Sequence, residues 1–509
     1  CDRDFAEARR WYALAAERGH ARAELGLGVI HENGLGVAAD LKTAAEWYER
    51  SAAKGNSDAQ VALALLCDTG RGVPPDPARA ASLLEQAAER GHPRGRHHFA
   101  LHLLAGEGVA ENRVMAETHL RQAALAGHRP AMVALARLHG DGFEAAQWWR
   151  AAANAGDPEA QFAVAVRYAR GEGAPQRPDT AARWFEKAAE QGHASAQFNM
   201  GICRLTGSGI ERDAALAAAW FTRAAQQQMI PAEIRLAQLH FTGEGVPQDH
   251  RKAAEWLRRP AASGNSEAET LLAGLYLSGS GVAPDRAEAE RLLRSASGRG
   301  YGPALLQLGH LCAADRALPA KRDEAIRCYR AAAERGVLAA QLIVARNLLA
   351  GHWGERRPEE AAIWFRKAAE AGHAGAQFQL GVMYGTGLGV PADPAASVAW
   401  YRRAADQGER TAQYNLAVML LRGDGVERDP QTAIEWHRKS ADQGLPEAQT
   451  ALGDIHANGI GVEADPEAAR AWYEKAAAQG HGPAQSRLAA LRGPRVVATV
   501  QPLQARGGG

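Results

Sequence analysis

A glycine recurs at intervals of 36 residues along almost the whole chain, each time after a run such as AAERG, AAEQG or AADQG. Two places break the pattern. Gln228 stands where the glycine is expected without disturbing the register, and the interval from Gly127 to Gly156 is only 29 residues. A fixed period of this length is typical of proteins built from stacked helical units. The recurring glycines are Gly19, Gly55, Gly91, Gly127, Gly156, Gly192, Gly264, Gly300, Gly336, Gly372, Gly408, Gly444 and Gly480.

The unit that begins at Gly372 shows the pattern of one repeat most clearly. Mostly small or apolar residues follow the glycine at offsets 4, 5, 8, 9 and 12, which predicts the buried stripe of a first helix. The glycine at offset 9 lets a neighbouring helix approach closely. A Gly-x-Gly-Val-x-x-Asp segment then has the composition of a turn. The stripe residues are Ala376, Gln377, Leu380, Gly381 and Tyr384.

A second helix is predicted after that turn. Asp393 is expected to accept hydrogen bonds from the free amides at its start, and Pro394 suits the first helical position. The helix ends before Gly408, a residue type that adopts the left-handed closing conformation. Tryptophan marks one position of this helix, 28 residues after the repeat glycine, and we interpret it as a repeated core position that needs no ligand. Its occupants are Trp11, Trp47, Trp148, Trp184, Trp220, Trp256, Trp364, Trp400, Trp436 and Trp472.

The period predicts an all-α chain of about 28 helices, paired as helix-turn-helix units with no β-sheet. The short unit after Gly127 is expected to keep both helices and lose only the connecting loop. The consensus fades in two blocks, 55–127 and 264–336, and Pro260 lies just before the second. Both blocks are either looser joints that bend the superhelix or segments specialised for a partner. The divisions are half a unit at 1–18, thirteen units forming one solenoid at 19–480, half a unit at 481–492 and a disordered tail at 493–509.

Charge and hydropathy exclude two classes of partner. The 59 Lys and Arg residues nearly balance the 58 Asp and Glu residues, so the net charge is +1, and no basic stripe is visible. Nucleic-acid binders normally carry such an excess or stripe. No run of 18 or more apolar residues occurs, so no membrane span is predicted. The chain begins at Cys1 without a methionine, which leaves open a segment upstream and a lipid anchor on Cys1.

The repeat resembles the Sel-one-like repeat family, a branch of the tetratricopeptide superfamily, from residue 4 to about 492. The resemblance implies a right-handed α-α superhelical solenoid whose concave groove binds a protein or peptide, in a scaffold or adaptor. It implies no catalytic residues and no cofactor. Such bacterial proteins favour the periplasm or cell envelope slightly over the cytoplasm. The resemblance is carried by AQFNMG (196–201), AQYNLA (412–417), GEGVPQD (243–249), GLGVPAD (387–393), WFEKAAEQG (184–192) and WYEKAAAQG (472–480).

Three motifs suggest chemistry but have simpler explanations. Ser51 and Lys54 match the Ser-x-x-Lys pair of penicillin-recognising enzymes, yet they fall where other repeats carry KAAE or RAAD, and no Lys-Thr-Gly follows. The glycine loops lack the Gly-Lys-Ser/Thr of a phosphate loop and the oxygen ligands of a calcium loop. A zinc site is the third possibility, but no carboxylate or cysteine completes a ligand set, so we predict no metal. The histidines concerned are His97, His98, His102 and His119.

Two cysteines replace large aromatic residues within one repeat. Cys312 occupies the Tyr position of a first helix, and Cys328 occupies the Trp position of the following second helix. These positions are expected to face each other across the helix pair. The two thiols are therefore either packed together or joined in a disulfide, which an oxidising compartment would favour.

The first helix carries a candidate binding face opposite the buried stripe. By analogy with tetratricopeptide geometry, aromatic residues at offset 6 and aliphatic residues one turn later are expected to line the concave groove and to contact a protein or peptide. Alternatively, they pack against neighbouring first helices. The aromatic residues are Phe162, Phe198, Phe378 and Tyr414, and the aliphatic residues are Val166, Ile202, Val382 and Val418.

A non-catalytic interaction scaffold is the function that the sequence predicts. With a net charge near zero, binding should depend on shape and apolar contact more than on charge. The alternatives are the repeat region of an enzyme or regulatory protein whose chemistry lies upstream of Cys1, and a disfavoured penicillin-binding or β-lactamase-like activity.

Overall fold

A computed structural model describes residues 5–172, 175–314 and 319–491, and in these segments every regular element is a helix. Consecutive helices pack against each other from α1 to α14 and from α16 to α28. The all-helical repeat fold is confirmed. The first fifteen helices are α1 (Phe5–Glu17), α2 (Ala21–Asn33), α3 (Leu41–Ala53), α4 (Ser57–Thr69), α5 (Pro77–Glu89), α6 (Pro93–Ala105), α7 (Arg113–Leu125), α8 (Arg129–Leu138), α9 (Phe143–Asn154), α10 (Pro158–Arg170), α11 (Pro178–Glu190), α12 (Ala194–Thr206), α13 (Ala214–Gln226), α14 (Ile230–Thr242) and α15 (His250–Ala262). The others are α16 (Ser266–Ser278), α17 (Arg286–Gly298), α18 (Gly302–Ala314), α19 (Pro319–Glu334), α20 (Leu338–Ala350), α21 (Pro358–Glu370), α22 (Ala374–Thr386), α23 (Pro394–Asp406), α24 (Arg410–Arg422), α25 (Pro430–Asp442), α26 (Pro446–Asn458), α27 (Pro466–Ala478) and α28 (Gly482–Leu491).

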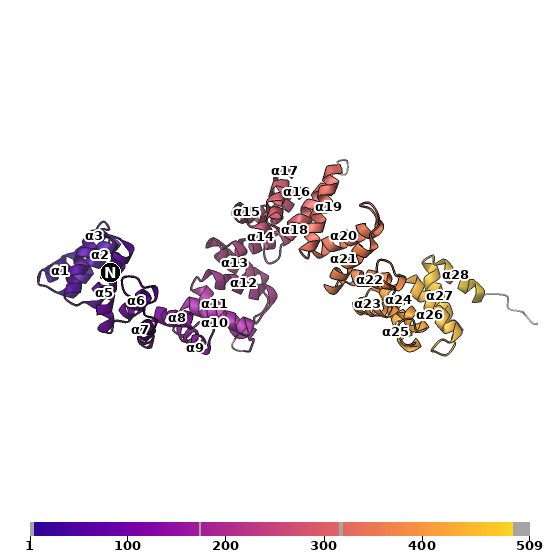
Figure 1. The fold of residues 1–509 in the computed structure, drawn as a ribbon, viewed down its shortest axis with the longest axis horizontal. Coiled ribbons are helices and arrows are strands. Elements are labelled where there is room, and N and C mark those ends of the chain that lie inside the picture. Colours follow the sequence, from indigo (N-terminus) through magenta and orange to yellow (C-terminus); the bar gives the residue numbers. More distant parts are fainter. Residues whose placement is uncertain (1–4, 173–174, 315–318, 492–509) are drawn as a thin grey trace, which may run out of the picture. The chain divides into compact units, whose positions relative to one another are not determined.

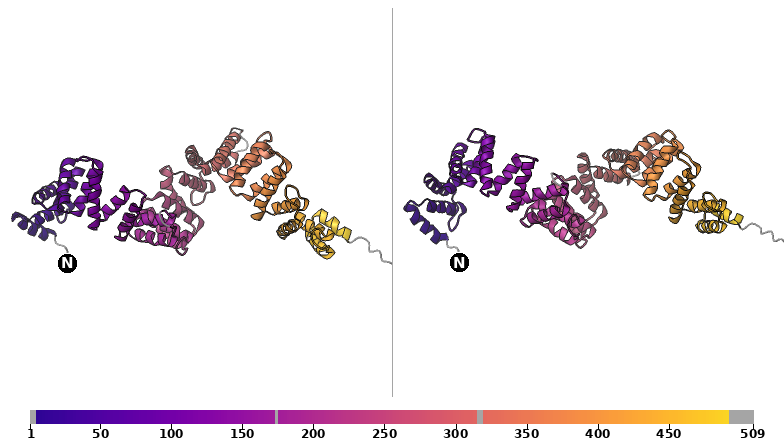
Figure 2. Two further views of the ribbon diagram at one scale, coloured as in Figure 1. Left: turned by 60° about the horizontal axis from the view of Figure 1, so that its bottom comes forward. Right: turned by 90° about the horizontal axis from the view of Figure 1, so that it is seen from below.

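The chain divides into two compact units, residues 1–256 and 257–509, and the boundary falls inside α15. Pro260, close to this boundary, lies inside the same helix. In the views of Figures 1 and 2, the successive helices of each unit follow one another in chain order. Among the described residues, no helix is both long and apolar enough to cross a membrane. Cys1 and the predicted tail at 493–509 lie outside the described residues.

Local capping explains where the helices begin and end. The His373 ring accepts a hydrogen bond from the Ala376 amide at the start of α22, Nδ1 to N 3.1 Å, so this histidine is a helix cap. Asp393 caps α23 in the same way at 2.9 Å, as the sequence predicts. Gln228, in place of a repeat glycine, adopts a left-handed φ of +63°. The backbone conformation is therefore kept even where glycine is absent.

Loop glycines permit close contact between repeats. Gly389 has a φ of +73°, and a Cβ atom at this residue would lie 2.3 Å from the backbone carbonyl carbon of Pro358. Pro358 begins α21, the second helix of the preceding repeat. In this repeat and in several others, the loop after the first helix therefore rests directly on the start of the preceding second helix, where a side chain would not fit.

The tryptophan position is not the centre of the core, which corrects the sequence interpretation. Trp400 is half-buried, and the Arg403 guanidinium lies 4.5 Å from its ring centroid. Tyr401, the next residue, is buried, and a Cβ atom on Gly381 of the adjacent first helix would meet its ring at 2.6 Å. Core packing therefore centres on the residue 29 positions after the repeat glycine, while most tryptophans cover its edge. Trp11 is even 66% exposed.

The short unit loses more than its loop. Its first helix, α8, has 10 residues and its second, α9, has 12, whereas both helices of a standard repeat have 13. The prediction that only the loop would shorten is wrong. Both helices survive because α8 still buries Ala131, Leu135 and Ala136, the positions of the apolar stripe.

Candidate functional site

The four aromatic residues of the candidate binding face lie partly in the core. Each is half-buried, and each ring packs against a side chain on the second helix of its own repeat rather than only against neighbouring first helices. The ring centroids are 5.8 Å apart for Phe162 and Phe185, 5.6 Å for Phe198 and Phe221, 5.9 Å for Phe378 and Tyr401, and 5.5 Å for Tyr414 and His437.

The side chains one turn further along complete a semi-exposed apolar band. Val382 and Val418 are half-buried, and both follow an aromatic residue by four positions. Other first helices expose large apolar side chains at the same offset or three residues later. We call the side of the first helices that carries these residues the first-helix face. The exposed members are Val29, Leu101, Phe241 and Leu277.

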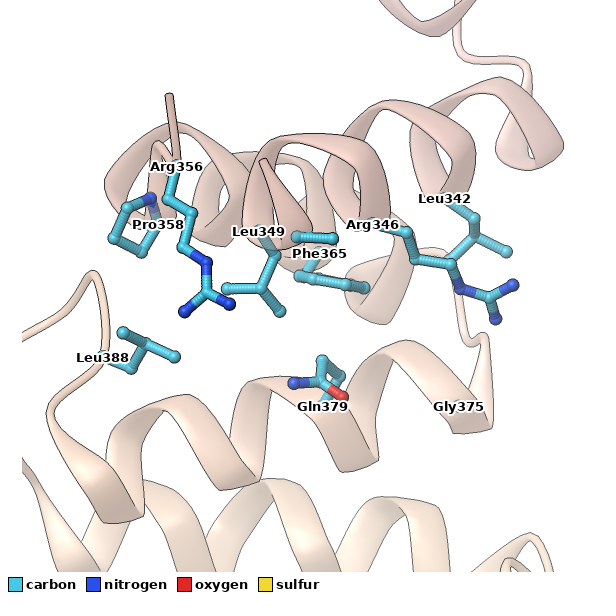
Figure 3. Close-up of a pocket in the computed structure, with 10 residues that line it drawn as sticks. Leu342, Arg346, Leu349, Arg356, Pro358, Phe365, Gly375, Gln379 and Leu388 are labelled. Carbon is cyan, nitrogen blue, oxygen red and sulfur yellow. The ribbon is translucent and has the colours of Figure 1, made fainter. Parts of the chain in front are cut away.

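A hollow of about 380 Å³ opens between the first helices α20 and α22, and we call it the α20–α22 hollow. Figure 3 shows the Arg346 and Arg356 guanidinium groups at opposite ends, with Leu349, Phe365 and Gln379 between them. Arg346 stands at the offset that carries Val382 in the next repeat. A second hollow of about 460 Å³ lies between α16 and α18 and has no arginine in its lining.

A ladder of buried amides joins consecutive repeats, and it is not apparent from a sequence pattern in which Gln377 belongs to the apolar stripe. The Gln377 amide donates to the Ala369 carbonyl at 3.0 Å, and its oxygen accepts from Gln407, 30 residues later, at 2.7 Å. In two repeats a Glu replaces the first glutamine and a cation replaces the second. Glu269 pairs with Arg299 in one of them. The paired change from two glutamines to a glutamate and a cation can be detected in the sequence, but only by comparing residues 30 positions apart.

Ser51 and Lys54 are parts of this packing rather than an exposed nucleophile and base. Ser51 is 0% exposed, and its hydroxyl donates to the Ala21 carbonyl at 2.7 Å. The Lys54 ammonium lies 2.8 Å from a carboxylate oxygen of the buried Glu24. Ser440 repeats the arrangement by donating to the Arg410 carbonyl at 2.8 Å. The Ser-x-x-Lys motif therefore coincides with a structural position of the repeat.

The four histidines considered for a zinc site lie on α6 and α7 and contact other side chains. His97 and His98 have ring centroids 5.0 Å apart, and burial lowers their pKa values to about 3 and about 4. His102 lies elsewhere on the helix, with Nε2 3.1 Å from an Asp68 carboxylate oxygen. His119 packs edge-on against Phe99. His97 and His98 therefore contact each other, whereas His102 and His119 each have a different partner.

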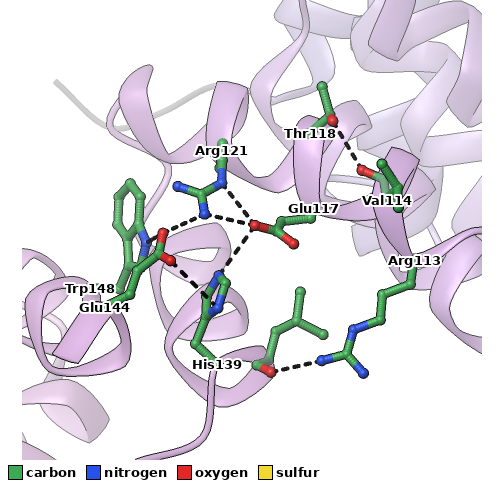
Figure 4. A network of polar contacts seen from close by, with 9 residues as sticks. Arg113, Val114, Glu117, Thr118, Arg121, His139, Glu144 and Trp148 are labelled. Atoms are coloured by element: carbon green, nitrogen blue, oxygen red, sulfur yellow. Dashed lines mark hydrogen bonds and ion pairs between the residues drawn. The ribbon is translucent and has the colours of Figure 1, made fainter. Parts of the chain in front are cut away.

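Among the described residues, one group of three potential metal ligands is close enough to share an ion: Glu117, His139 and Glu144, with ligand atoms within 4.8 Å of one another. The Arg121 guanidinium already pairs with both carboxylates (Figure 4), at 2.7 Å from Glu117. The His139 ring nitrogens lie 3.4 and 3.7 Å from the same two side chains. Because Arg121 supplies the positive charge, we interpret the group as an ion-pair network that ties α7 to the short unit.

Cys312 and Cys328 are both buried, on the two helices of one repeat, and both are free thiols in this structure. Burial raises the pKa of Cys312 to about 11 and also raises that of Cys328. Reduced thiols with raised pKa values react slowly. Their oxidation to a disulfide in the native protein stays a prediction.

The fold and the first-helix face define an α-solenoid of helix-pair repeats. The profile of the Sel1 repeat matches fourteen segments, and the chain belongs to the Sel1 repeat family. The matched residues are 1–20, 21–56, 57–92, 100–128, 130–157, 158–193, 194–229, 230–265, 266–301, 302–337, 338–373, 374–409, 411–445 and 446–481.

Two solved structures are similar in sequence. One is a protective antigen present in uropathogenic Escherichia coli strains, which displays an SLR fold. It is 30% identical, with 88% of this chain and 90% of that chain covered and a TM-score of 0.50. The other is a Sel1 repeat protein from Oxalobacter formigenes, 29% identical, covering 59% of this chain and 90% of that chain with a TM-score of 0.45. A comparison with curated proteins finds no match.

Proposed function

We propose that this chain is a non-catalytic scaffold that binds a protein or peptide in a groove lined by its first-helix face. The repeat family supports an interaction role, since Sel1 repeats form scaffolds of this kind. The observation that carries the proposal is the semi-exposed apolar band of the first-helix face, and a hollow opens between two of these first helices. Partly apolar grooves between helices suit extended or helical peptides.

The proposal is tested by selecting binders for the full chain from a library of random peptides. Val382→Glu and Val418→Glu together place two charges on the face, and the selected peptides should lose most of their affinity. These valines are better probes than Phe378 and Tyr414, because a charge at either aromatic position would also disturb core packing. Melting temperature shows whether the variants remain folded.

Ile363→Glu is a matched control on a second helix. Ile363 is 52% exposed, so a charge is accommodated there and binding should be unchanged. Equal loss of affinity in the control and in the valine variants would contradict the role of the first-helix face. Failure to select any peptide would contradict peptide binding itself.

A further inference from the structure

The α20–α22 hollow differs from the rest of the first-helix face in its charge. Arg346 is the single Asp, Glu, Lys or Arg residue in α20, and α22 contains none. Arg356 enters the same hollow from the loop before α21. The walls contain no acidic residue, and they include Leu342, Leu349 and the buried Phe365.

Two arginines near the hollow already have partners within the chain, in contrast to Arg346 and Arg356. Arg330 pairs with Glu360 at 2.7 Å, and Arg366 donates to the Tyr384 hydroxyl at 2.8 Å. Arg346 and Arg356 are exposed, and neither makes an ion pair or hydrogen bond with any residue that the structure describes. Two guanidinium groups thus flank an apolar floor with their donors unused by the chain, and a guanidinium pairs best with a planar carboxylate.

We propose that the α20–α22 hollow binds a segment of a partner protein in which an apolar side chain lies between two acidic residues. The apolar side chain contacts Leu349 and Phe365, and each carboxylate pairs with one of the two arginines. Aspartate or glutamate side chains fit better than the end of a chain, because a chain terminus supplies one carboxylate whereas the cations stand at opposite ends of the hollow. This inference rests on the proposed function and adds the chemistry of the partner.

The near-zero net charge of the chain predicts binding that depends little on charge, and this hollow is a local exception. Exposed ion pairs weaken as salt screens them. Affinity for the acidic segment should therefore fall as the ionic strength rises. The hollow between α16 and α18 provides an internal contrast, because its lining includes Leu277, Gln307 and Leu311 but no arginine, and it should not favour acidic peptides.

The test uses the peptides selected from the random library by the full-length chain. They should be enriched in an apolar residue flanked by aspartate or glutamate. The double variant Arg346→Glu, Arg356→Glu should lower their affinity at least about tenfold, since both attractive pairs become repulsive. Replacing the peptide's acidic residues by Gln or Asn should weaken binding to the wild type, because it removes the attraction, and should strengthen binding to the variant, because it removes the repulsion between like charges.

Arg402→Glu with Arg438→Glu is the matched control, because both arginines are exposed on second helices and the change in net charge is the same. Its affinity for the peptides should be unchanged. The inference is overturned if the selected peptides depend on Val382 and Val418 but are not enriched in aspartate or glutamate. It is also overturned if they bind the Arg346/Arg356 variant as well as the wild type. In both cases the proposed function stands. If no peptide is selected, both fail.

Discussion

Replacing His437 by Phe should make the chain more stable in acid. His437 occupies the core position that carries Tyr401 in the preceding repeat, and it is 0% exposed. Neither ring nitrogen has a hydrogen-bond partner in the structure, and burial lowers the pKa of the ring to about 4. Ala417 faces this position, and two other repeats combine such an alanine with phenylalanine, as Ala345 and Phe365 do. A phenylalanine ring is therefore compatible with the site.

The magnitude follows from the two pKa values of His437. The ordinary value is 6.5, which applies to the unfolded chain, and the folded value is about 4. Below pH 6.5 the His437 ring is protonated in the unfolded chain, whereas it stays neutral in the folded chain down to about pH 4. The free energy of unfolding therefore falls as the pH falls toward 4. The difference of about 2.5 between the two pKa values corresponds to about 3 kcal/mol of folding stability in total. About 2 kcal/mol of this stability is already lost at pH 5. Phenylalanine removes this loss.

Hydrogen exchange of α24 to α26 is the appropriate assay, because long repeat arrays do not unfold as one two-state unit. Wild type and His437→Phe are compared at the same pH, so that intrinsic exchange rates cancel. The protection gained by the variant should be larger at pH 5 than at pH 7.5 by about 2 kcal/mol. His352→Phe, at an exposed histidine, should show no such pH dependence. A gain that is equal at both pH values would refute the reasoning.

Three further substitutions test the repeat contacts. Gln228→Gly should stabilise α13 and α14 by about 1 kcal/mol in hydrogen exchange, because a left-handed φ of +63° is strained for glutamine; unchanged or lower protection of these helices would contradict this. Arg299→Gln should destabilise the chain by about 3 kcal/mol, because it leaves the buried Glu269 carboxylate without its cation. Adding Glu269→Gln should restore most of that stability in hydrogen exchange of α16 and α17, and a double variant no better than the single would contradict the pairing. Gly381→Ala should destabilise by about 2 kcal/mol, since the new methyl group meets the Tyr401 ring at 2.6 Å. Adding Tyr401→Leu should recover part of that loss, and strictly additive losses would argue against the contact.

The elements of this fold could be predicted from the sequence because their boundaries are set locally. Asp393 and Gly408 act through hydrogen bonds and backbone conformation within a few residues of themselves, so one sequence suffices to place helix ends. The short unit was predicted less well. The residues missing from the short unit can be taken from the helices as well as from the loop. How many residues α8 keeps depends on its packing, which the sequence does not show.

Which residues of a helix are buried is harder to predict than where the helix begins and ends. Adjacent apolar residues fit the same periodic pattern equally well. Trp400 and Tyr401 are adjacent, and size alone favours the tryptophan as the centre of the core. Tyr401 is buried because the adjacent first helix has no side chain at Gly381. The Arg403 cation then covers the outer indole face. The recurrent Trp-x-x-Lys/Arg spacing already indicated that one face of the tryptophan stays close to water, since a lysine or arginine head is rarely buried without a partner.

The candidate site could be predicted only in the part that repeats. Apolar residues at fixed offsets identified the first-helix face, but a consensus describes what all units share, and that is mainly packing. The α20–α22 hollow arises where one unit departs from the two that follow it: Arg346 stands at the offset that carries Val382 and Val418 in those units, and Arg356 comes from a loop of different sequence. Neither residue predicts a site alone, because an isolated arginine is usually a solvated surface group. The juxtaposition becomes visible only when the packing of consecutive first helices shows that both cations flank the same apolar floor without an acidic partner. In a solenoid whose repeats share most of their packing, such an unpaired departure from the consensus is the feature that can distinguish one ligand from another.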